Sequence, residues 1–479
     1  MYKRDSFFLQ PLFAILLIGI LYVLFPSINP SGDSYMFAHQ IRSGKDLFSP
    51  HHLIYNAFYF LPVKLFSIVK TLDFISFMNS LFAIGCLIFI NATLPKYATN
   101  STRFFLILLL GSCFGFMRYA TAGETYIIPL FFSLWASWWA YKQKSIIYIA
   151  FLAGIACLFH QIHIFWSLGL FIFTMIAYKG KTLHKFFQYA IGSCIVPITY
   201  FLVFFLTQHD SANIFEYIAH DYFHSEDVKF SFKSKSLVLT PISFIRTFFQ
   251  VHGYIIPLLQ KYWFIGIAMV ISILFGVIGL FRLKQTRKNI NQKFFDQQFA
   301  LCHLIIFFMQ LLFAAISDGN AEFMVMLPFA LALFIFVRFR FEKLPLYSFA
   351  LSLFIWNISA GLIPYHFLEL TSDPALGRYI KEHPEEVYYI KDRQTARENL
   401  AYHVPAQQFK LYTIQNDNKE LNKLLSENAS VLSDIFTTRT LSRASFANPV
   451  ALEFSSYAVQ VEDSIHYDLG TLIISRIKK

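Results

Sequence analysis

Long runs of apolar residues, many close to twenty residues in length, constrain this chain more than any other feature of its sequence. Residues 7–26 and 262–281 contain no charged side chain, and about twenty apolar residues are what an α-helix needs to cross the hydrocarbon core of a bilayer. Only 14% of the 479 residues are charged and 56% are hydrophobic, which excludes an ordinary water-soluble domain. The sequence therefore predicts an α-helical polytopic membrane protein.

Hydropathy read in windows of about nineteen residues predicts about eleven transmembrane helices. The predicted spans are residues 7–26, 72–94, 104–117, 125–141, 145–159, 162–178, 187–207, 262–281, 298–316, 323–337 and 345–363. The apolar run 53–69 contains Pro62 and Lys64 and lies between polar segments. We therefore expect an interfacial or re-entrant helix there rather than a further span.

Lys and Arg gather in alternate loops between the predicted spans, which predicts the orientation of the chain. Because cytoplasmic loops are the basic ones, the amino terminus is expected in the cytoplasm and the loops 27–71 and 208–261 on the outer face. The net charge of +11 then belongs to bases that flank the membrane, so we expect no nucleic-acid partner. The composition favours a bacterial inner membrane, although a protein of the endoplasmic reticulum would have a similar topology.

The composition changes after Ile363, from apolar to mixed polar. Apolar stretches EVYYI, FKLYTI and LIISRI alternate there with helix-like segments such as RQTARENLAYH and NKELNKLLSE. That alternation predicts a small α/β domain. We therefore divide the chain into a transmembrane domain, residues 1–363, and a soluble domain on the outer face, residues 364–479.

Two carboxylates stand at the membrane ends of predicted outer loops. Asp33 follows the first span in NPSGDSYMF, and Glu124 lies in ATAGETY, six residues after Arg118. Paired acids at a membrane surface suit acid–base chemistry or the binding of a divalent cation. The alternatives are that Asp33 only caps a short helix over residues 34–42 and that Glu124 is a solvated helix start favoured by the helix dipole.

Histidines form a second group of polar residues at the predicted outer face. His51 and His52 occur in SPHHLIY, and His160 and His163 in HQIH. Imidazoles can donate hydrogen bonds to a phosphate, and a spacing of three also suits a metal, although no third ligand lies nearby in sequence. The alternative is that these rings cap interfacial helices beside aromatic side chains.

Two later segments complete the set of candidate residues. The amphipathic stretch ISFIRTFFQ carries Arg246 and is followed by His252, so it predicts an interfacial helix that can hold a lipid phosphate. The alternative is that Arg246 only reaches out to water from such a helix. Asp318 and Glu322 in SDGNAEF are either substrate contacts or turn residues.

At GDSYMFAHQ followed by SPHHLIY, and at MRYATAGETYIIPLFFSLWA, the chain resembles the C-type glycosyltransferase (GT-C) superfamily. These are polytopic membrane enzymes that include protein mannosyltransferases and aminoarabinose transferases. The similarity is one of layout: an Asp opens a long first outer loop and a second acid stands at the next. Many members carry two adjacent acids where this chain has Asp33 and Ser34, and the His-Pro order is changed at residues 50–52.

The resemblance implies a membrane glycosyltransferase that moves a sugar from a polyprenyl-phosphate donor to a hydroxyl of a lipid, glycan or protein acceptor on the outer face, with inversion at the anomeric carbon. Asp33 and Glu124 would be catalytic. The expected substrate-binding residues are His51, His52, Arg118, Arg246, His252, Asp318 and Glu322. A divalent cation near the phosphate is left open.

Two other functions are compatible with the sequence. One is a transporter or flippase of lipid-linked saccharides, which the charge-poor spans and the lack of paired broken helices disfavour. The other is a polymerase or ligase of surface polysaccharide, for which the long loop 208–261 would carry the basic groups.

Overall fold

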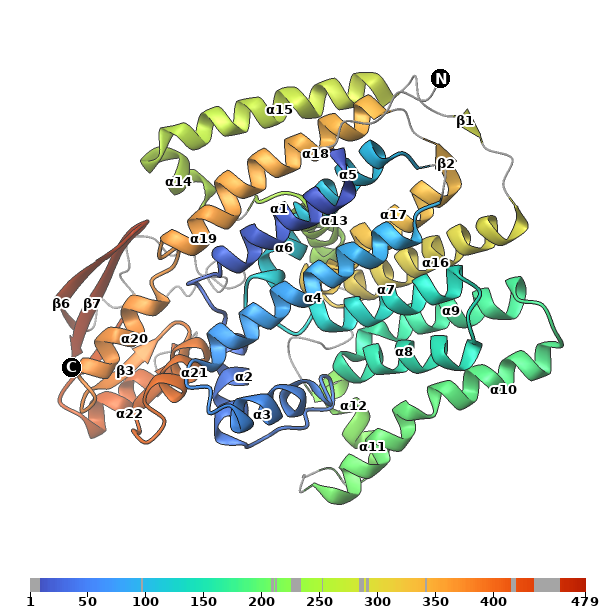
Figure 1. The fold of residues 1–479 in the computed structure, drawn as a ribbon. Helices are drawn as coiled ribbons and strands as arrows, with labels where there is room; N and C mark the ends of the chain where they lie inside the picture. The colour runs from blue at the N-terminus through green and yellow to red at the C-terminus, as the bar shows by residue number, and fades with distance from the viewer. Residues whose placement is uncertain are drawn as a thin grey trace.

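The computed structural model describes residues 9–95, 98–207, 211, 213–224, 234–251, 253–283, 288–289, 293–340, 343–414, 419–434 and 457–479. Its larger part is a bundle of helices that run roughly side by side, and a mixed sheet with helices lies at one end of that bundle (Figure 1).

Helices coincide with every predicted span. The bundle contains α1 (Pro11–Leu24), α4 (Thr71–Thr93), α5 (Asn100–Gly111), α6 (Phe114–Ala120), α7 (Ile127–Tyr141), α8 (Ile146–Phe159), α9 (Ile164–Ala177), α10 (Thr182–Ser193), α11 (Ile195–Leu206), α12 (Ile214–His224), α13 (Ser234–Phe248), α14 (Ile255–Lys261), α15 (Trp263–Leu283), α16 (Phe294–Ile316), α17 (Leu327–Arg338), α18 (Lys343–Asn357) and α19 (Ile363–Phe367).

Several of these helices have the length and composition of membrane spans. In the described part of the chain, five qualify as continuous spans, and six do if α5 and α6, which meet at a 70° bend, count as one. Five more apolar helices have 10 to 17 residues. Large apolar side chains such as Leu206, Phe264 and Phe281 remain exposed on the bundle, as expected where lipid replaces water as the solvent. The chain is an integral membrane protein.

The first predicted outer loop folds into two short helices. α2 (Gly32–Ser43) contains the helix expected over residues 34–42. α3 (Tyr55–Leu65) has 11 residues with Pro62 inside, so at about 1.5 Å per residue it is far too short to cross a bilayer about 30 Å thick. The rings of Tyr55 and Tyr59 on α3 are fully buried against α2, α4 and α7 in one apolar cluster.

The carboxy-terminal residues form a five-stranded sheet in the order β4-β3-β5-β7-β6. β3 (Val387–Ile390), β4 (Lys410–Thr413) and β5 (Val431–Ser433) are parallel, while β7 (Gly470–Lys478) runs antiparallel to β5 and to β6 (Ala458–Tyr467). We call α20 (Asp373–Glu382) through β7 the C-terminal unit.

Helices cover both faces of this sheet. Ala396 and Leu400 of α21 (Arg393–His403) pack on Tyr388 and Ile390 of β3, and α20 joins that cluster. Leu421 and Leu424 of α22 (Lys419–Glu427) pack on the other two β3 side chains, which point to the opposite face. The predicted strands at residues 386–390, 409–414 and 472–477 and both predicted helices are present, whereas α20, β5 and β6 were not predicted.

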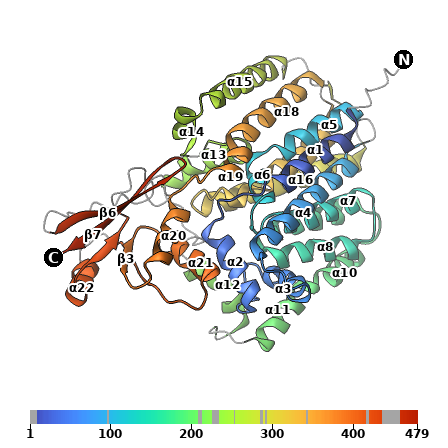
Figure 2. The same cartoon turned by 60° about the vertical axis from the view of Figure 1, so that its left-hand side comes forward.

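Two features describe how the helical bundle and the C-terminal unit join, and a third lies at the other end of the bundle. α18 continues through a π-helical turn, Ile358–Leu362, into α19, so helical structure passes the predicted boundary at residue 363. A short pair, β1 (Lys288–Asn289) with β2 (Phe339–Arg340), lies at the opposite end of the bundle. The C-terminal unit lies against α2, with α21 beside it (Figure 2). The division of the chain into two domains remains a prediction.

Candidate functional site

Asp33 lies in the first turn of α2 with its side chain exposed. The cap of this helix is Ser31, whose Oγ accepts a hydrogen bond from the Ser34 amide at 3.0 Å. Asp33 is therefore not the capping residue that the simpler interpretation expected. The amino-terminal end of a helix favours a negative charge, so this position stabilises an ionised carboxylate at the surface.

Glu124 is buried directly beside the start of α2. Its Oε1 accepts hydrogen bonds from Ser31 Oγ at 2.6 Å and from Ser34 Oγ at 3.2 Å. Its backbone carbonyl accepts from Asn79 Nδ2 of α4 at 2.7 Å and from the Tyr55 hydroxyl of α3 at 3.2 Å. With 5% of its surface exposed, Glu124 is not a solvated helix start. It joins three elements to the turn that precedes α7.

Glu322 is the third acid of this group. It begins a 3₁₀ turn, Glu322–Met324, and its Oε2 accepts a hydrogen bond from the Tyr126 hydroxyl at 3.0 Å. Burial raises the pKa of Glu124 well above its usual range, and the charges of Glu322 and Asp33 raise it further, against the hydrogen bond from Ser31 and the charge of Arg118. We call Ser31, Asp33, Glu124 and Glu322 the acid junction.

Arg118 stands on α6 among tyrosines. Its guanidinium carbon lies 5.4 Å from the ring centre of Tyr119 and 5.8 Å from that of Tyr365. Tyr365 in turn contacts Tyr254, with ring centres 5.7 Å apart. Burial raises the pKa of the Tyr254 hydroxyl, and the positive charges of Arg118 and Arg246 both act in the lowering direction. Two arginines from separate elements thus act on the same buried tyrosine pair.

An apolar cavity of about 210 Å³ lies between α5, α13, α15, α17 and α18. Its lining includes Phe248, which follows Arg246 by two residues. The rest of the lining comes from α5, α15, α17 and α18, among them Leu106, Leu110, Leu283, Ala332 and Phe349. The cavity has the polarity of a hydrocarbon chain.

The histidines lie at another contact between loops, and each has its own surroundings. The rings of His52 and His160 meet edge to face with centres 4.4 Å apart, and His51 lies 6.2 Å from His52. His163 Nδ1 is 2.7 Å from Ser133 Oγ of α7 instead. His160 has an extended backbone and precedes the 3₁₀ turn that His163 ends, so the two do not share one helical face. We call these four residues the histidine junction.

This arrangement bears on the question of a cation. Within the described ranges, no group of three or more His, Cys, Asp or Glu side chains has the arrangement of a metal site. Burial lowers the pKa of His52 to about 3, so its ring is neutral at physiological pH. His160 is neutral for the same reason, and its ring lies 5.1 Å from that of Tyr126, which places the histidine junction next to the acid junction.

The two acids of SDGNAEF, Asp318 and Glu322, lie in different surroundings. Asp318 has φ +54° and Gly319 has φ +71°, and a Cβ on Gly319 would lie 2.7 Å from the Thr240 amide nitrogen, so this is a tight turn packed on α13. Asp318 Oδ1 accepts a hydrogen bond from Ser236 Oγ of α13 at 3.1 Å. Arg246 lies in the last turn of that helix, as expected, and His252 lies outside the described residues.

Several residues of the site were not singled out in the sequence. Ser31 and Ser34 flank Asp33, but serines in a loop are too common to stand out. Asn79 is a lone amide inside an apolar span, and such residues are usually functional or structural ties, so it was a usable signal. Tyr126 and Tyr365 look like ordinary interfacial aromatics, and only the fold brings them to acids and arginines.

No protein-family model and no curated protein matches the chain in sequence. Among solved structures, ArnT from Cupriavidus metallidurans bound to undecaprenyl phosphate is similar over 97% of this chain and 97% of its own, with a TM-score of 0.54 and 10% sequence identity. The apo state of ArnT aligns over the same shares with a TM-score of 0.42 and 12% identity. The chain therefore has the fold of ArnT, an aminoarabinose transferase of the GT-C superfamily, and the resemblance found in its sequence is confirmed at the level of the fold.

Proposed function

We propose that this protein transfers a glycosyl group from a polyprenyl-phosphate donor to an acceptor hydroxyl at the outer face of a bacterial inner membrane. The observation that carries the proposal is the acid junction: an exposed carboxylate, Asp33, stands in the first turn of α2, and a buried one, Glu124, accepts hydrogen bonds from Ser31 and Ser34 on either side of it. The similarity of fold to ArnT, solved with undecaprenyl phosphate, supports the donor class.

The different surroundings of the two acids suit different roles. Asp33 is the general base: it takes the acceptor proton while the acceptor oxygen attacks the anomeric carbon and the bond from that carbon to the phosphate oxygen breaks. Because the acceptor displaces the phosphate directly, the configuration at the anomeric carbon inverts. Glu124, whose raised pKa favours the neutral acid, positions α2 through Ser31 and Ser34 and orients the acceptor.

The leaving group is a lipid phosphate, which gains negative charge as the bond breaks. Arg118 lies beside Tyr365, and its charge and that of Arg246 both act on Tyr254, so these are the cations we assign to that phosphate. The apolar cavity lined in part by Phe248 would take part of the polyprenyl chain, because Phe248 stands on the same helix as Arg246 and the lining is almost wholly apolar. His252, Glu322, His51, His52 and Asp318 remain proposed substrate contacts of second rank.

The test is transfer by the purified protein in lipid vesicles. Undecaprenyl phosphate carrying a labelled hexose, pentose or amino sugar is offered with lipid, glycan and protein fractions of a bacterial envelope as acceptors. The proposal expects label to move from one donor class to one fraction, with undecaprenyl phosphate released and the anomeric configuration inverted. If no donor loses its label, the protein is not this transferase. If the intact labelled lipid instead crosses the bilayer, the protein is a transporter.

A further inference from the structure

The helix that carries Asp33 is held on its second side by the C-terminal unit. A Cβ on Gly32 would lie 3.1 Å from Thr395 Oγ1 and 3.4 Å from Thr395 Cα, so the start of α2 and the first turn of α21 meet at backbone distance. Gly32 precedes Asp33 directly. Any movement of α21 at Thr395 is therefore transmitted to the residue next to the proposed base.

Thr395 is itself fixed to the sheet. Asp392 follows β3 and caps α21, because its Oδ1 accepts from the Thr395 amide and its Oδ2 accepts from the Thr395 hydroxyl, both at 2.9 Å. The Lys391 amide donates to Asp434 Oδ1 at 3.0 Å, which ties the end of β3 to the end of β5. The Gly32 contact thus rests on a rigid part of the C-terminal unit.

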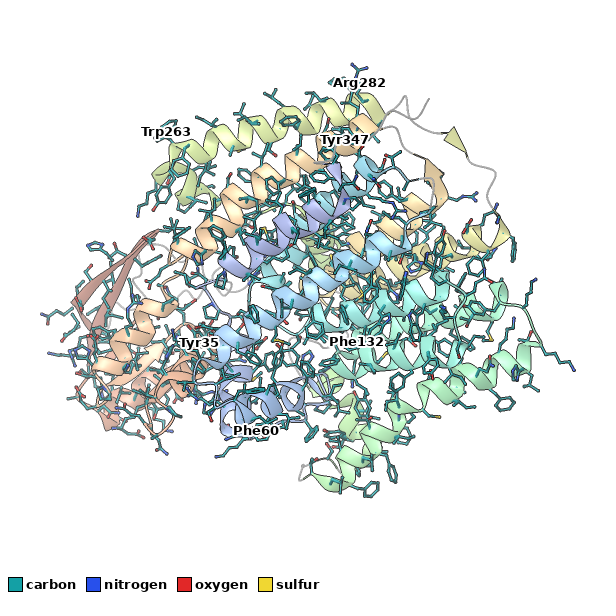
Figure 3. All side chains as sticks on the ribbon, viewed as in Figure 1. Tyr35, Phe60, Phe132, Trp263, Arg282 and Tyr347 are labelled. Atoms are coloured by element: carbon teal, nitrogen blue, oxygen red, sulfur yellow. The ribbon has the colours of Figure 1, made fainter. Side chains whose placement is uncertain are left out.

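The contact continues along one face of α21, at residues 395, 399 and 402, the spacing of one helical stripe. Burial raises the pKa of the Tyr35 hydroxyl of α2 to about 12, and the nearby Asn399 side chain acts in the lowering direction. Tyr402 is 8% exposed and shares an apolar cluster with Tyr35, Phe37 and Ile41 of α2. Figure 3 shows Tyr35 where α2 meets the C-terminal unit.

Tyr402 also contacts the last turn of α2 and the start of α4. The Arg42 guanidinium donates to the Tyr402 carbonyl and lies 4.7 Å above its ring centre, and the Tyr402 hydroxyl accepts a hydrogen bond from the Leu72 amide at the start of α4 at 3.4 Å. α21 is therefore fitted against both ends of α2 and against a helix of the bundle. An appended domain that served only as a flexible tether would need none of these contacts.

We infer that α21 is the positioning element of the active site, and that Thr395, through its backbone-distance contact with Gly32, is a positioning residue that sets where the Asp33 carboxylate stands. The inference rests on the proposed function. It assigns the C-terminal unit a part in the chemical step, since displacing a catalytic group by about 1 Å can cost a hundredfold in rate.

The experiment is a double-mutant cycle with Gly32→Ala, Thr395→Ala and both together, in the vesicle transfer assay. A methyl group at Gly32 pushes against Thr395 Oγ1, so Gly32→Ala is expected to lower kcat about tenfold and to leave KM within about twofold of wild type. The expected loss is smaller than a hundredfold because Asp33 would move by tenths of an ångström rather than by about 1 Å. Removing Oγ1 makes room, so the double variant recovers most of kcat. Gly276→Ala, where the new methyl meets Ser352 at an ordinary 3.5 Å, is the control.

The outcomes separate the inference from the function on which it rests. Equal kcat in wild type and Gly32→Ala, or a loss that Thr395→Ala leaves unrelieved, overturns the positioning role while wild-type transfer still supports the transferase. Absence of transfer by wild type overturns both. Thermal unfolding of each variant is measured in parallel. If Gly32→Ala fails to fold, Thr395→Ala alone is used, and we then expect it to lower kcat at unchanged KM and Thr395→Ser to restore kcat. A wild-type kcat in Thr395→Ala would overturn the positioning role.

Discussion

The acid junction and the histidine junction looked alike in the sequence but differ in structure. Both consist of titratable residues in loops between apolar runs, and both lie where several loops meet. In the acid junction one carboxylate is exposed and the other is buried and supplied with hydroxyl donors. In the histidine junction, His160 and His163 are buried and His52 is held neutral. A polar loop becomes a candidate active site only where one group stays open to a substrate.

The most direct test of the difference between the two junctions is to neutralise the exposed acid, Asp33. Asp33→Asn keeps the size of the side chain but removes the base, and general-base catalysis contributes about 10²- to 10⁴-fold, so transfer should fall by that factor. The measurement is the initial rate of sugar transfer in vesicles that contain equal amounts of each protein. Asp73→Asn, an exposed acid in the first turn of α4, is the matched control and should remain near wild type. Full activity of Asp33→Asn would remove the proposed mechanism.

Variants of Glu124 distinguish two roles for this residue, a buried neutral acid and a second base. Because its pKa is raised, Gln imitates the protonated form, and Glu124→Gln should lower kcat by about tenfold or less. Glu124→Ala leaves the hydroxyls of Ser31 and Ser34 without this acceptor and should cost about a hundredfold, through misplacement of α2. Steady-state kinetics of the two variants decides. A Gln variant as damaged as Asp33→Asn would mean that Glu124 acts in its ionised form.

The two buried histidines of the histidine junction, His160 and His163, should respond in stability and not in activity. Ser133→Ala removes the partner of His163 Nδ1 and leaves a buried polar atom unsatisfied, at a cost of about 1–3 kcal/mol. The expected result is a lower thermal unfolding temperature in detergent, with transfer by the remaining folded protein unchanged. Ser137→Ala, in the same helix as Ser133, removes the partner of His303 and Trp166 and gives a comparison of similar burial. A selective loss of kcat in Ser133→Ala would place His163 in the site.

A further expected effect is on the pH dependence of stability. His52 has a pKa of about 3 in the folded protein, below its unfolded value of about 6.5, so the unfolded chain binds a proton there that the folded chain does not. Stability is thus fully present above pH 6.5 and falls as the pH drops toward 3, by up to about 1.4 kcal/mol per pH unit for this residue. His52→Phe should lose that part of the slope. Chemical unfolding at pH 7, 6 and 5 measures it, and an unchanged slope would contradict the buried neutral ring.

Much of the fold was predictable because membrane insertion leaves a strong local signal. Each predicted span coincides with a helix, and β3, β4, β7, α21 and α22 appear where alternation or helical spacing placed them. α20 and β5 were missed because their identity depends on packing against the sheet rather than on their own periodicity. β6 was missed because it is an exposed strand whose side chains show no alternation in burial.

The sequence by itself determined that this is a membrane protein, because apolar runs of this length have no other stable place, and it pointed to Asp33 and Glu124 through their places at the ends of spans. Only the tertiary structure decided that Ser31 caps α2 and also donates to Glu124, that Glu322 joins the acids through Tyr126, and that Thr395 meets Gly32. Gly32 and Thr395 are 363 positions apart in the chain, and contacts over such separations are set by the packing of whole elements, which no local pattern encodes.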